Sequence, residues 1–180
     1  MSAIQSLCRK ALFLKNGKLM KFGETKEVID SYLGMRESAA ITEFAPEAQK
    51  TAQITKIIIQ NKHGTPSGVI PISSDFFLRI QFEIRQPIRQ VAITAWFYAQ
   101  GELLLSSSDS DTGAILVDYA PGTYETTIRI PAFLFNVGQY FFAVRILQPF
   151  VDAIDYRPNI GFEISDENNP ISEVYRGHHM

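Results

Sequence analysis

FFLRIQFEI, residues 76–84, places an apolar side chain at every second position. A β-strand turns successive side chains to opposite faces, so this period of two predicts a strand with one face in a hydrophobic core. The predicted core residues are Phe76, Leu78, Ile80, Phe82 and Ile84. The other face carries Arg79, Gln81 and Glu83 and is expected to be largely solvated.

The same alternation recurs on both sides of this strand. Further strands are predicted at residues 54–59, 91–98, 103–106, 124–130, 139–146 and 160–164, separated by turn residues such as Gln86-Pro87 and Ala120-Pro121-Gly122. About seven or eight strands with no helical period between them predict an all-β fold, an antiparallel β-sandwich of immunoglobulin-like or jelly-roll type. We assign it to residues 51–180.

The first 34 residues follow another pattern, which predicts a helix, a hairpin and a second helix. Ile4, Leu7, Cys8 and Ala11 have helical spacing, and Cys8 is expected to be buried there. Asn16-Gly17 is a hairpin signal, and Gly23 is expected to end the second strand. Thr25 is the predicted N-cap of the second helix, whose inner face carries Val28, Ile29 and Tyr32. Residues 35–50 lack periodicity and are predicted to be a linker.

The composition of the chain argues against several classes of function. The chain has 180 residues, 46% of them hydrophobic, and a net charge of −2. That balance is typical of a globular protein and gives no basic patch for a nucleic-acid partner. No apolar run is long enough to cross a bilayer, and no secretory signal is seen. One cysteine among 180 residues fits a reducing, cytoplasmic compartment.

Two predicted strands carry an unusual outward face. The core alternation of residues 91–98 leaves Thr94, Trp96 and Tyr98 outside, and that of residues 139–147 leaves Phe141 and Arg145 outside. If the strands are neighbours, these side chains share one surface. Aromatic rings stack on the C–H face of a pyranose, and an arginine holds hydroxyls or anionic groups. The alternative is that a loop, the linker or a second subunit covers these rings.

A serine-rich loop at residues 106–111 is expected to border this surface, with Ser106 and Asp109 donating or accepting hydrogen bonds to sugar hydroxyls. The predicted carbohydrate-binding residues are therefore Trp96, Tyr98, Arg145, Thr94, Phe141, Ser106 and Asp109. No catalytic residues, metal site or cofactor are predicted. Asp109, Asp111 and Asp118 lack the context of a glycosidase pair, and Asp109-x-Asp111-x-Gly113 lacks the remaining ligands of a calcium loop.

Residues 3–19, AIQSLCRKALFLKNGKL, and residues 27–33, EVIDSYL, resemble the end of an ABC-transporter ATPase domain. The later segments at residues 54–59, 76–84, 138–140 and 162–164 are similar to the C-terminal sandwich of polysaccharide-exporting ATPases of the Wzt type. Residues 1–34 are accordingly expected to be a remnant of the ATPase domain. The chain has no Walker A loop, so it is expected to be a fragment of a longer ATPase and not itself an enzyme.

The resemblance implies a role in export of O-antigen, a component of lipopolysaccharide. It implies recognition of the non-reducing end of a polysaccharide carried on polyprenyl diphosphate, coupling substrate identity to export. It also implies a homodimer, in which residues 171–175 are our candidate for an exchanged C-terminal strand, and a separate membrane permease that keeps the protein at the inner membrane. The alternative is a ligand-free dimerisation or regulatory domain of a polysaccharide or teichoic-acid exporter, with the outward rings in its interface.

Overall fold

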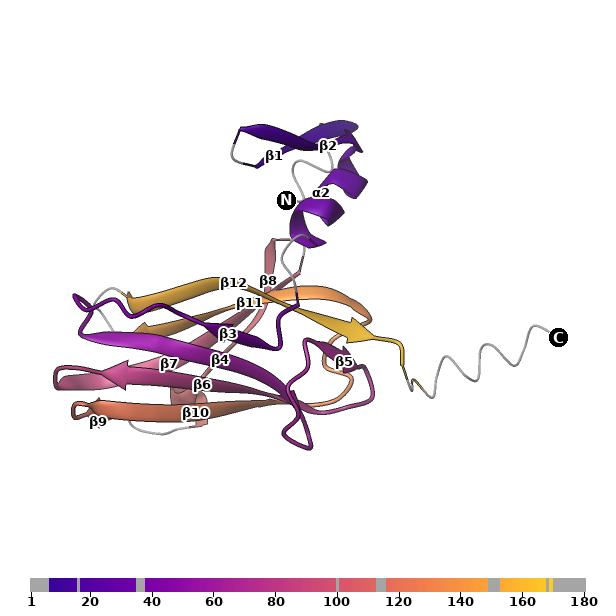
Figure 1. The fold of residues 1–180 in the computed structure, drawn as a ribbon. Helices are drawn as coiled ribbons and strands as arrows, with labels where there is room; N and C mark the ends of the chain where they lie inside the picture. The colour runs from indigo at the N-terminus through magenta and orange to yellow at the C-terminus, as the bar shows by residue number, and fades with distance from the viewer. Residues whose placement is uncertain are drawn as a thin grey trace.

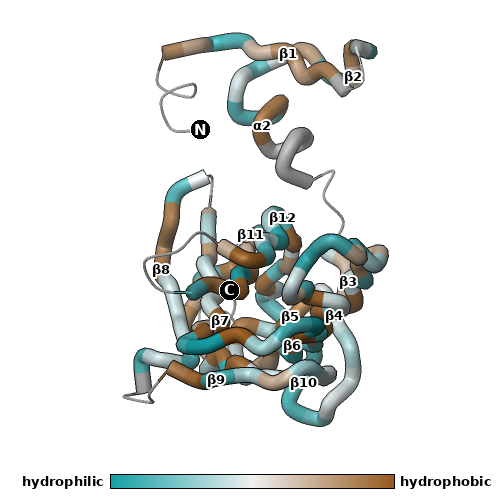
Figure 2. Tube along the Cα trace, turned by 90° about the vertical axis from the view of Figure 1, so that its left-hand side faces the viewer, coloured by the Kyte–Doolittle hydropathy of each residue, from teal (hydrophilic) through white to brown (hydrophobic). Residues whose placement is uncertain are grey.

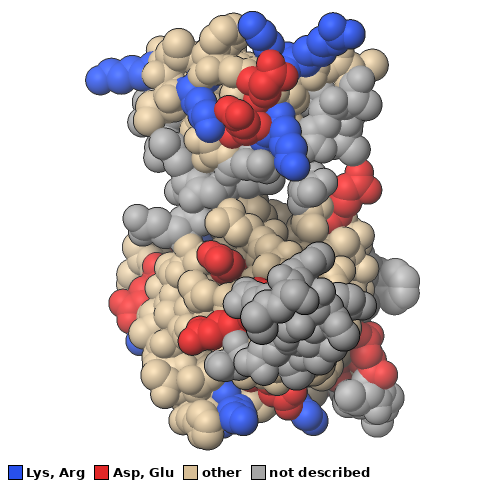
Figure 3. All heavy atoms as spheres, turned by 90° about the vertical axis from the view of Figure 1, so that its right-hand side faces the viewer, with Lys and Arg blue, Asp and Glu red and all other residues tan. Residues whose placement is uncertain are grey.

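The computed structural model describes residues 7–15, 17–34, 38–99, 101–112, 116–148, 153–167 and 169. They form a hairpin with a helix, followed by a two-layer β-sandwich (Figure 1). Among the helices described, none has the length and hydropathy needed to cross a bilayer. Basic and acidic side chains are dispersed over the sandwich on the face drawn in Figure 3.

The hairpin consists of β1 (Lys10–Lys15) and β2 (Lys18–Glu24), and it is followed by helix α2 (Thr25–Gly34). Gly17 has a φ of 76°, the left-handed conformation that the predicted turn requires. Val28 and Ile29 are buried, as expected for the inner face of the helix. The helix begins at Thr25, as predicted, but the Thr25 hydroxyl donates a hydrogen bond of 2.6 Å to the Cys8 carbonyl, which ties the helix to the chain that precedes the hairpin.

Three details of this part were predicted wrongly. Cys8 is exposed instead of buried in a helix, and Ala11 lies in β1. Gly23 does not end the second strand, because β2 continues to Glu24 and Gly23 pairs with Ala11. Most of the predicted first helix and the side chain of Tyr32 lie outside the described residues.

The sandwich packs a four-stranded sheet against a six-stranded sheet (Figures 1 and 2). The four-stranded sheet has the order β10 (Gly122–Ile130), β6 (Phe76–Ile84), β4 (Ala52–Asn61) and β3 (Ile41–Glu43). The six-stranded sheet has the order β5 (Val69–Pro71), β12 (Ala153–Ser165), β11 (Gly138–Leu147), β7 (Ile88–Ala99) and β8 (Glu102–Ser108), and β9 (Val117–Tyr119) also pairs with β7. A short 3-10 helix, η1 (Asp109–Thr112), follows β8.

The core lies between the two sheets and confirms the predicted alternation. All five predicted core residues of β6 are at most 1% exposed. Phe97, Phe142 and Phe162 of the six-stranded sheet cluster with one another, and the Phe162 ring lies 5.4 Å from that of Phe76 in the other sheet. In Figure 2 apolar positions recur along the strands of both sheets, as this packing requires.

The predicted linker contains part of the sandwich. Strand β3 lies within residues 35–50 and pairs with β4, so the sandwich begins at or before Ile41 instead of at residue 51. Farther along, Asp155 binds the same region: its buried carboxylate accepts hydrogen bonds from Lys50 Nζ and the Ile54 amide, both at 2.7 Å. Residues 171–175, proposed for strand exchange, lie outside the described residues.

Candidate functional site

The six-stranded sheet brings most of the predicted site residues onto its outer face, the side away from the core. Strand β11 pairs with β7, so that Phe141 lies opposite Tyr98 and Arg145 opposite Thr94. On the other side of β7, Ser106 of β8 lies opposite Trp96. Trp96 is partly exposed and is absent from the core cluster, whereas its neighbours Ala95 and Phe97 belong to it. The expected strand neighbours and strand parity are therefore both present.

Arg145 lies between two aromatic side chains of this face. Its guanidinium carbon is 3.9 Å from the centroid of the Trp96 ring and 5.3 Å from the centroid of the Tyr156 ring. The Nε of Arg145 is buried and has no hydrogen-bond partner. Because a cation over an aromatic face is attracted by the ring quadrupole, the three side chains form one stack across β7, β11 and β12. One face of the indole is therefore already in contact with a cation.

Tyr98 lies next to this stack. Burial raises the pKa of the Tyr98 hydroxyl above its ordinary value, the nearby Tyr156 raises that pKa further, and Arg145 lowers it. The net effect raises the pKa of Tyr98, so its hydroxyl stays protonated at neutral pH and can donate a hydrogen bond. We define the aromatic face as Trp96, Tyr98, Arg145 and Tyr156.

Tyr156 was missed in the sequence because a bulge reverses the alternation of β12. Ile160, Phe162 and Ile164 point into the core, and simple alternation would send Tyr156 inward with them. Arg157 pairs with Val144 and Ile160 pairs with Phe142, so two residues, Pro158 and Asn159, stand opposite one on β11. Asn159 has a φ of 65°. This extra residue turns Tyr156 outward, where it is 44% exposed.

Two predicted contact residues form the floor of the face. Thr94 and Phe141 lie at positions of their strands that face away from the core, yet both are only 7% exposed. Ala143, which lies opposite Trp96 on β11, is buried as well. These residues support the exposed side chains and offer a ligand little surface. Ser106 is exposed beside Trp96, where its hydroxyl is accessible.

Asp109 has a structural role that the sequence did not reveal. One carboxylate oxygen accepts a hydrogen bond of 3.0 Å from the Ile93 backbone amide. Burial raises the pKa of this carboxyl, against the lowering effect of its hydrogen bonds. Asp111 likewise accepts from the Ser108 amide at 2.7 Å. The two carboxylates thus hold η1 against β7 and β8, and no cluster of three metal-ligating side chains is found among the described residues.

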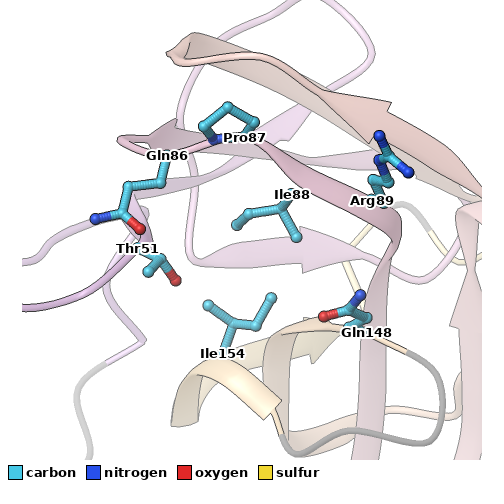
Figure 4. Close-up of a pocket in the computed structure, with 7 residues that line it drawn as sticks. All are labelled: Thr51, Gln86, Pro87, Ile88, Arg89, Gln148 and Ile154. Carbon is cyan, nitrogen blue, oxygen red and sulfur yellow. The ribbon is translucent and has the colours of Figure 1, made fainter.

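A hollow lies at the end of the sandwich where β11 ends and β7 and β12 begin. It consists of two adjoining pockets of about 530 and 580 Å³, which share Arg89 and Gln148. Figure 4 shows the first pocket, with Ile88 and Ile154 between the polar side chains of Thr51, Gln86 and Gln148. We call the two pockets the end groove; its lining residues are Thr51, Gln86, Pro87, Ile88, Arg89, Gln90, Leu116, Asp118, Gln148 and Ile154.

The arginines of the sandwich fall into two groups. Arg79, Arg85, Arg129 and Arg157 each form an ion pair with a carboxylate. Arg145 and Arg89 form none with the described part of the chain. These two unneutralised cations lie on the aromatic face and in the end groove. Arg145 could be predicted from its outward-facing position in a strand, whereas Arg89 lies outside the predicted strand at residues 91–98 and could not.

Comparison with solved structures identifies the fold. The crystal structure of the C-terminal domain of Wzt is similar over 65% of this chain and 75% of that one, with a TM-score of 0.58 and 17% sequence identity. The sandwich therefore has a Wzt-like C-terminal domain fold.

More distant likenesses are a CARDB domain from Pyrococcus furiosus and a putative β-galactosidase from Bacteroides fragilis. The first has a TM-score of 0.40 and 9% identity and covers 66% of this chain and all of the other. The second has a TM-score of 0.35 and 17% identity and covers 57% of this chain and 15% of the other. No protein-family model and no curated protein matches the sequence.

Proposed function

We propose that this protein binds a polysaccharide without catalysing its cleavage, and that the aromatic face is the binding site. The observation that carries the proposal is the stack of Arg145 on Trp96 and Tyr156 on the outer face of a sheet. Such a face offers apolar ring surface beside charged and hydroxyl hydrogen-bond donors. A pyranose presents the matching pair of surfaces, a C–H face and a rim of hydroxyls.

The side chains of the aromatic face are better suited to binding a glycan than to cleaving one. Arg145, Tyr98 and Tyr156 are donors or ring surfaces, and the nearby carboxylates of Asp109 and Asp111 accept backbone amides. Glycoside hydrolysis uses two carboxyl groups that flank the scissile bond. The Wzt-like fold and the resemblance of residues 3–33 to an exporter ATPase support a place in polysaccharide export, at the cytoplasmic side of a membrane with a permease as partner.

A binding measurement with matched variants tests the proposal. Purified O-polysaccharides, with and without their terminal caps, are titrated into the protein by calorimetry. Tyr156→Ala is expected to weaken binding of the recognised glycan about tenfold or more, because it removes one ring of the stack. By analogy with the stacking of a nucleic-acid base on an aromatic side chain, the contact of one sugar ring with Tyr156 contributes roughly 1–3 kcal/mol to binding. Phe77→Ala, which removes an aromatic ring from the outward-facing side of β6, is the control and is expected to leave binding unchanged. Equal losses in both variants, or no binding of any glycan at millimolar concentration, would refute the proposal.

A second candidate function is dimerisation without a ligand. It is favoured by Leu103 and Leu104, which are 53% and 49% exposed on β8, a strand at the edge of the six-stranded sheet. Exposed apolar side chains on an edge strand are suited to pairing with a second chain. In that case Leu103→Lys would dissociate the dimer, while Tyr156→Ala would affect neither assembly nor any glycan. Sedimentation equilibrium of the two variants separates the two functions.

A further inference from the structure

The end groove contains two consecutive side chains that both face solvent, Arg89 and Gln90. Their neighbours Ile88 and Val91 are both buried, so the alternation of β7 is broken between them, and the pairing of β7 with β9 shifts at the same place. Gln90 has a φ of 54°, a conformation that costs a non-glycine residue about 1–2 kcal/mol. The Asp118 carboxylate holds this irregular backbone by accepting the Gln90 amide at 2.9 Å.

The lining of the groove combines apolar and polar surface in the way that a sugar ring does. Ile88, Ile154 and Pro87 supply apolar contact surface, and three glutamines and Thr51 supply amide and hydroxyl groups. In Figure 4 the polar side chains of Gln86, Thr51, Gln148 and Arg89 surround the two isoleucines. Each pocket is within the range of about 300–1,000 Å³ that is typical of small-molecule sites.

Arg89 adds a positive charge that the described residues do not neutralise by an ion pair. The other arginine of which this is true is Arg145, whereas the remaining four arginines described in the sandwich are paired with carboxylates. An exposed guanidinium beside hydrogen-bonding amides is suited to bidentate binding of a carboxylate. The ligand that matches the groove is therefore a sugar with an acidic substituent.

We infer that the end groove is a second saccharide-binding site, which accepts a uronic acid residue and holds its carboxylate with Arg89. The inference rests on the proposed function in one respect, namely that the uronic acid is part of the same polymer. Gln148 directly follows β11 and lies three residues beyond Arg145, at most about 10 Å along the chain, so the two sites are near enough for one glycan chain to reach both. The protein then prefers an acidic polysaccharide to a neutral one.

The site can be tested with monosaccharides, before the polymer is known. D-glucuronate, D-glucose and inorganic phosphate are titrated into the ¹⁵N-labelled protein, and the amide signals of Gln90, Gln148 and Asp118 are followed. We expect saturable shifts with glucuronate and at least tenfold weaker binding of glucose and phosphate. Arg89→Gln is expected to weaken glucuronate binding about tenfold or more, and higher salt is expected to weaken it in the wild type. Arg129→Gln is the matched control, because it removes from β10 a cation that is already paired with Asp75.

Four outcomes would overturn the inference: no shift with glucuronate, equal binding of glucose, equal binding of phosphate, or equal effects of Arg89→Gln and Arg129→Gln. The proposed function fails separately. If glucuronate shifts the amide signal of Gln90 but no polysaccharide binds the aromatic face, then the saccharide site in the end groove is supported and the proposed function is refuted. If Tyr156→Ala abolishes binding of a polysaccharide, while Arg89→Gln changes the binding of neither the polysaccharide nor glucuronate, then the proposed function is supported and the site in the end groove is refuted.

Discussion

At the scale of single residues, Arg145 gives the aromatic face its character. Its guanidinium is placed by two rings instead of by a carboxylate. Such a contact contributes about 0.5–2 kcal/mol, depending on desolvation, and it leaves the charge available to a ligand. An arginine neutralised by an acidic partner, such as Arg79 beside Glu125, has much less to offer an incoming hydroxyl or anion.

The first prediction concerns this charge. Arg145→Gln is expected to weaken glycan binding about tenfold or more, because it removes both the charge and the planar donor group that stacks on Trp96. Arg79→Gln on the other sheet is expected to leave affinity unchanged. Isothermal calorimetry with the recognised polysaccharide measures both. An Arg145 variant that binds as tightly as the wild type would exclude this residue from the site.

The second prediction concerns Asp109. Because burial raises the pKa of its carboxyl in the folded state, ionisation at neutral pH opposes folding, and the native state gains stability as the pH falls through that raised pKa. Asp109→Asn keeps an oxygen for the Ile93 amide and removes the charge. We expect its Tm at pH 7 to exceed that of the wild type, and the difference to vanish at acidic pH. A lower Tm at pH 7 would show that the ionised carboxylate stabilises the fold.

At the scale of elements, alternation predicted the strands and their faces, and irregularities set the details of the site. Burial alternates strictly along β6, and in residues 91–97 of β7 and 140–146 of β11 the members of the core cluster also fall at every second position. Their core faces could therefore be identified from the residues alone. Tyr156 and Arg89 could not be found in this way. Each lies beside a bulge, where one extra residue reverses the alternation, and a bulge depends on the partner strand as much as on its own sequence.

The short strands were missed for a related reason. Strand β3 has three residues, too few to show a period, and it lies among the small residues of a predicted linker. The start of β12 was missed because of Pro158, which cannot donate a backbone hydrogen bond to a neighbouring strand. A proline at this position predicts the end of a strand. Such elements depend on contacts with residues far away in the chain.

The third prediction concerns the network that fastens residues 47–54 to β12. The side chain of Asp155 is fully buried and binds Lys50, Arg157 and the Ile54 amide. Asp155→Ala would leave these groups without their acceptor and is expected to lower the free energy of unfolding by about 3–5 kcal/mol. Glu125→Gln, which breaks a half-exposed pair with Arg79, is expected to cost less than about 1 kcal/mol. Urea denaturation of both variants measures the difference, and equal losses would show that burial of the Asp155 network contributes little.

At the scale of the whole molecule, the sandwich is the support whose outer face carries the proposed ligand site. The backbone pairing of β7, β11 and β12 sets the register that places Trp96, Arg145 and Tyr156 next to one another, and the core between the sheets stabilises the domain as a whole. A substitution deep in the core should therefore disturb the site only by unfolding the domain. Phe97→Ala is expected to lower stability by about 3–5 kcal/mol. Calorimetric titration at a temperature where this variant remains folded should show wild-type affinity, and a weaker affinity there would indicate that the face is not held rigidly.

The central claim is that a glycan binds at the aromatic face, and Trp96 allows a direct test because it is the one tryptophan among the 180 residues. The measurement is the intrinsic fluorescence of the intact protein during titration with a polysaccharide whose binding has been established by calorimetry. We predict a saturable change in Trp96 emission with the same Kd as the calorimetric one. Unchanged emission while the glycan is demonstrably bound would place its site elsewhere and contradict the account.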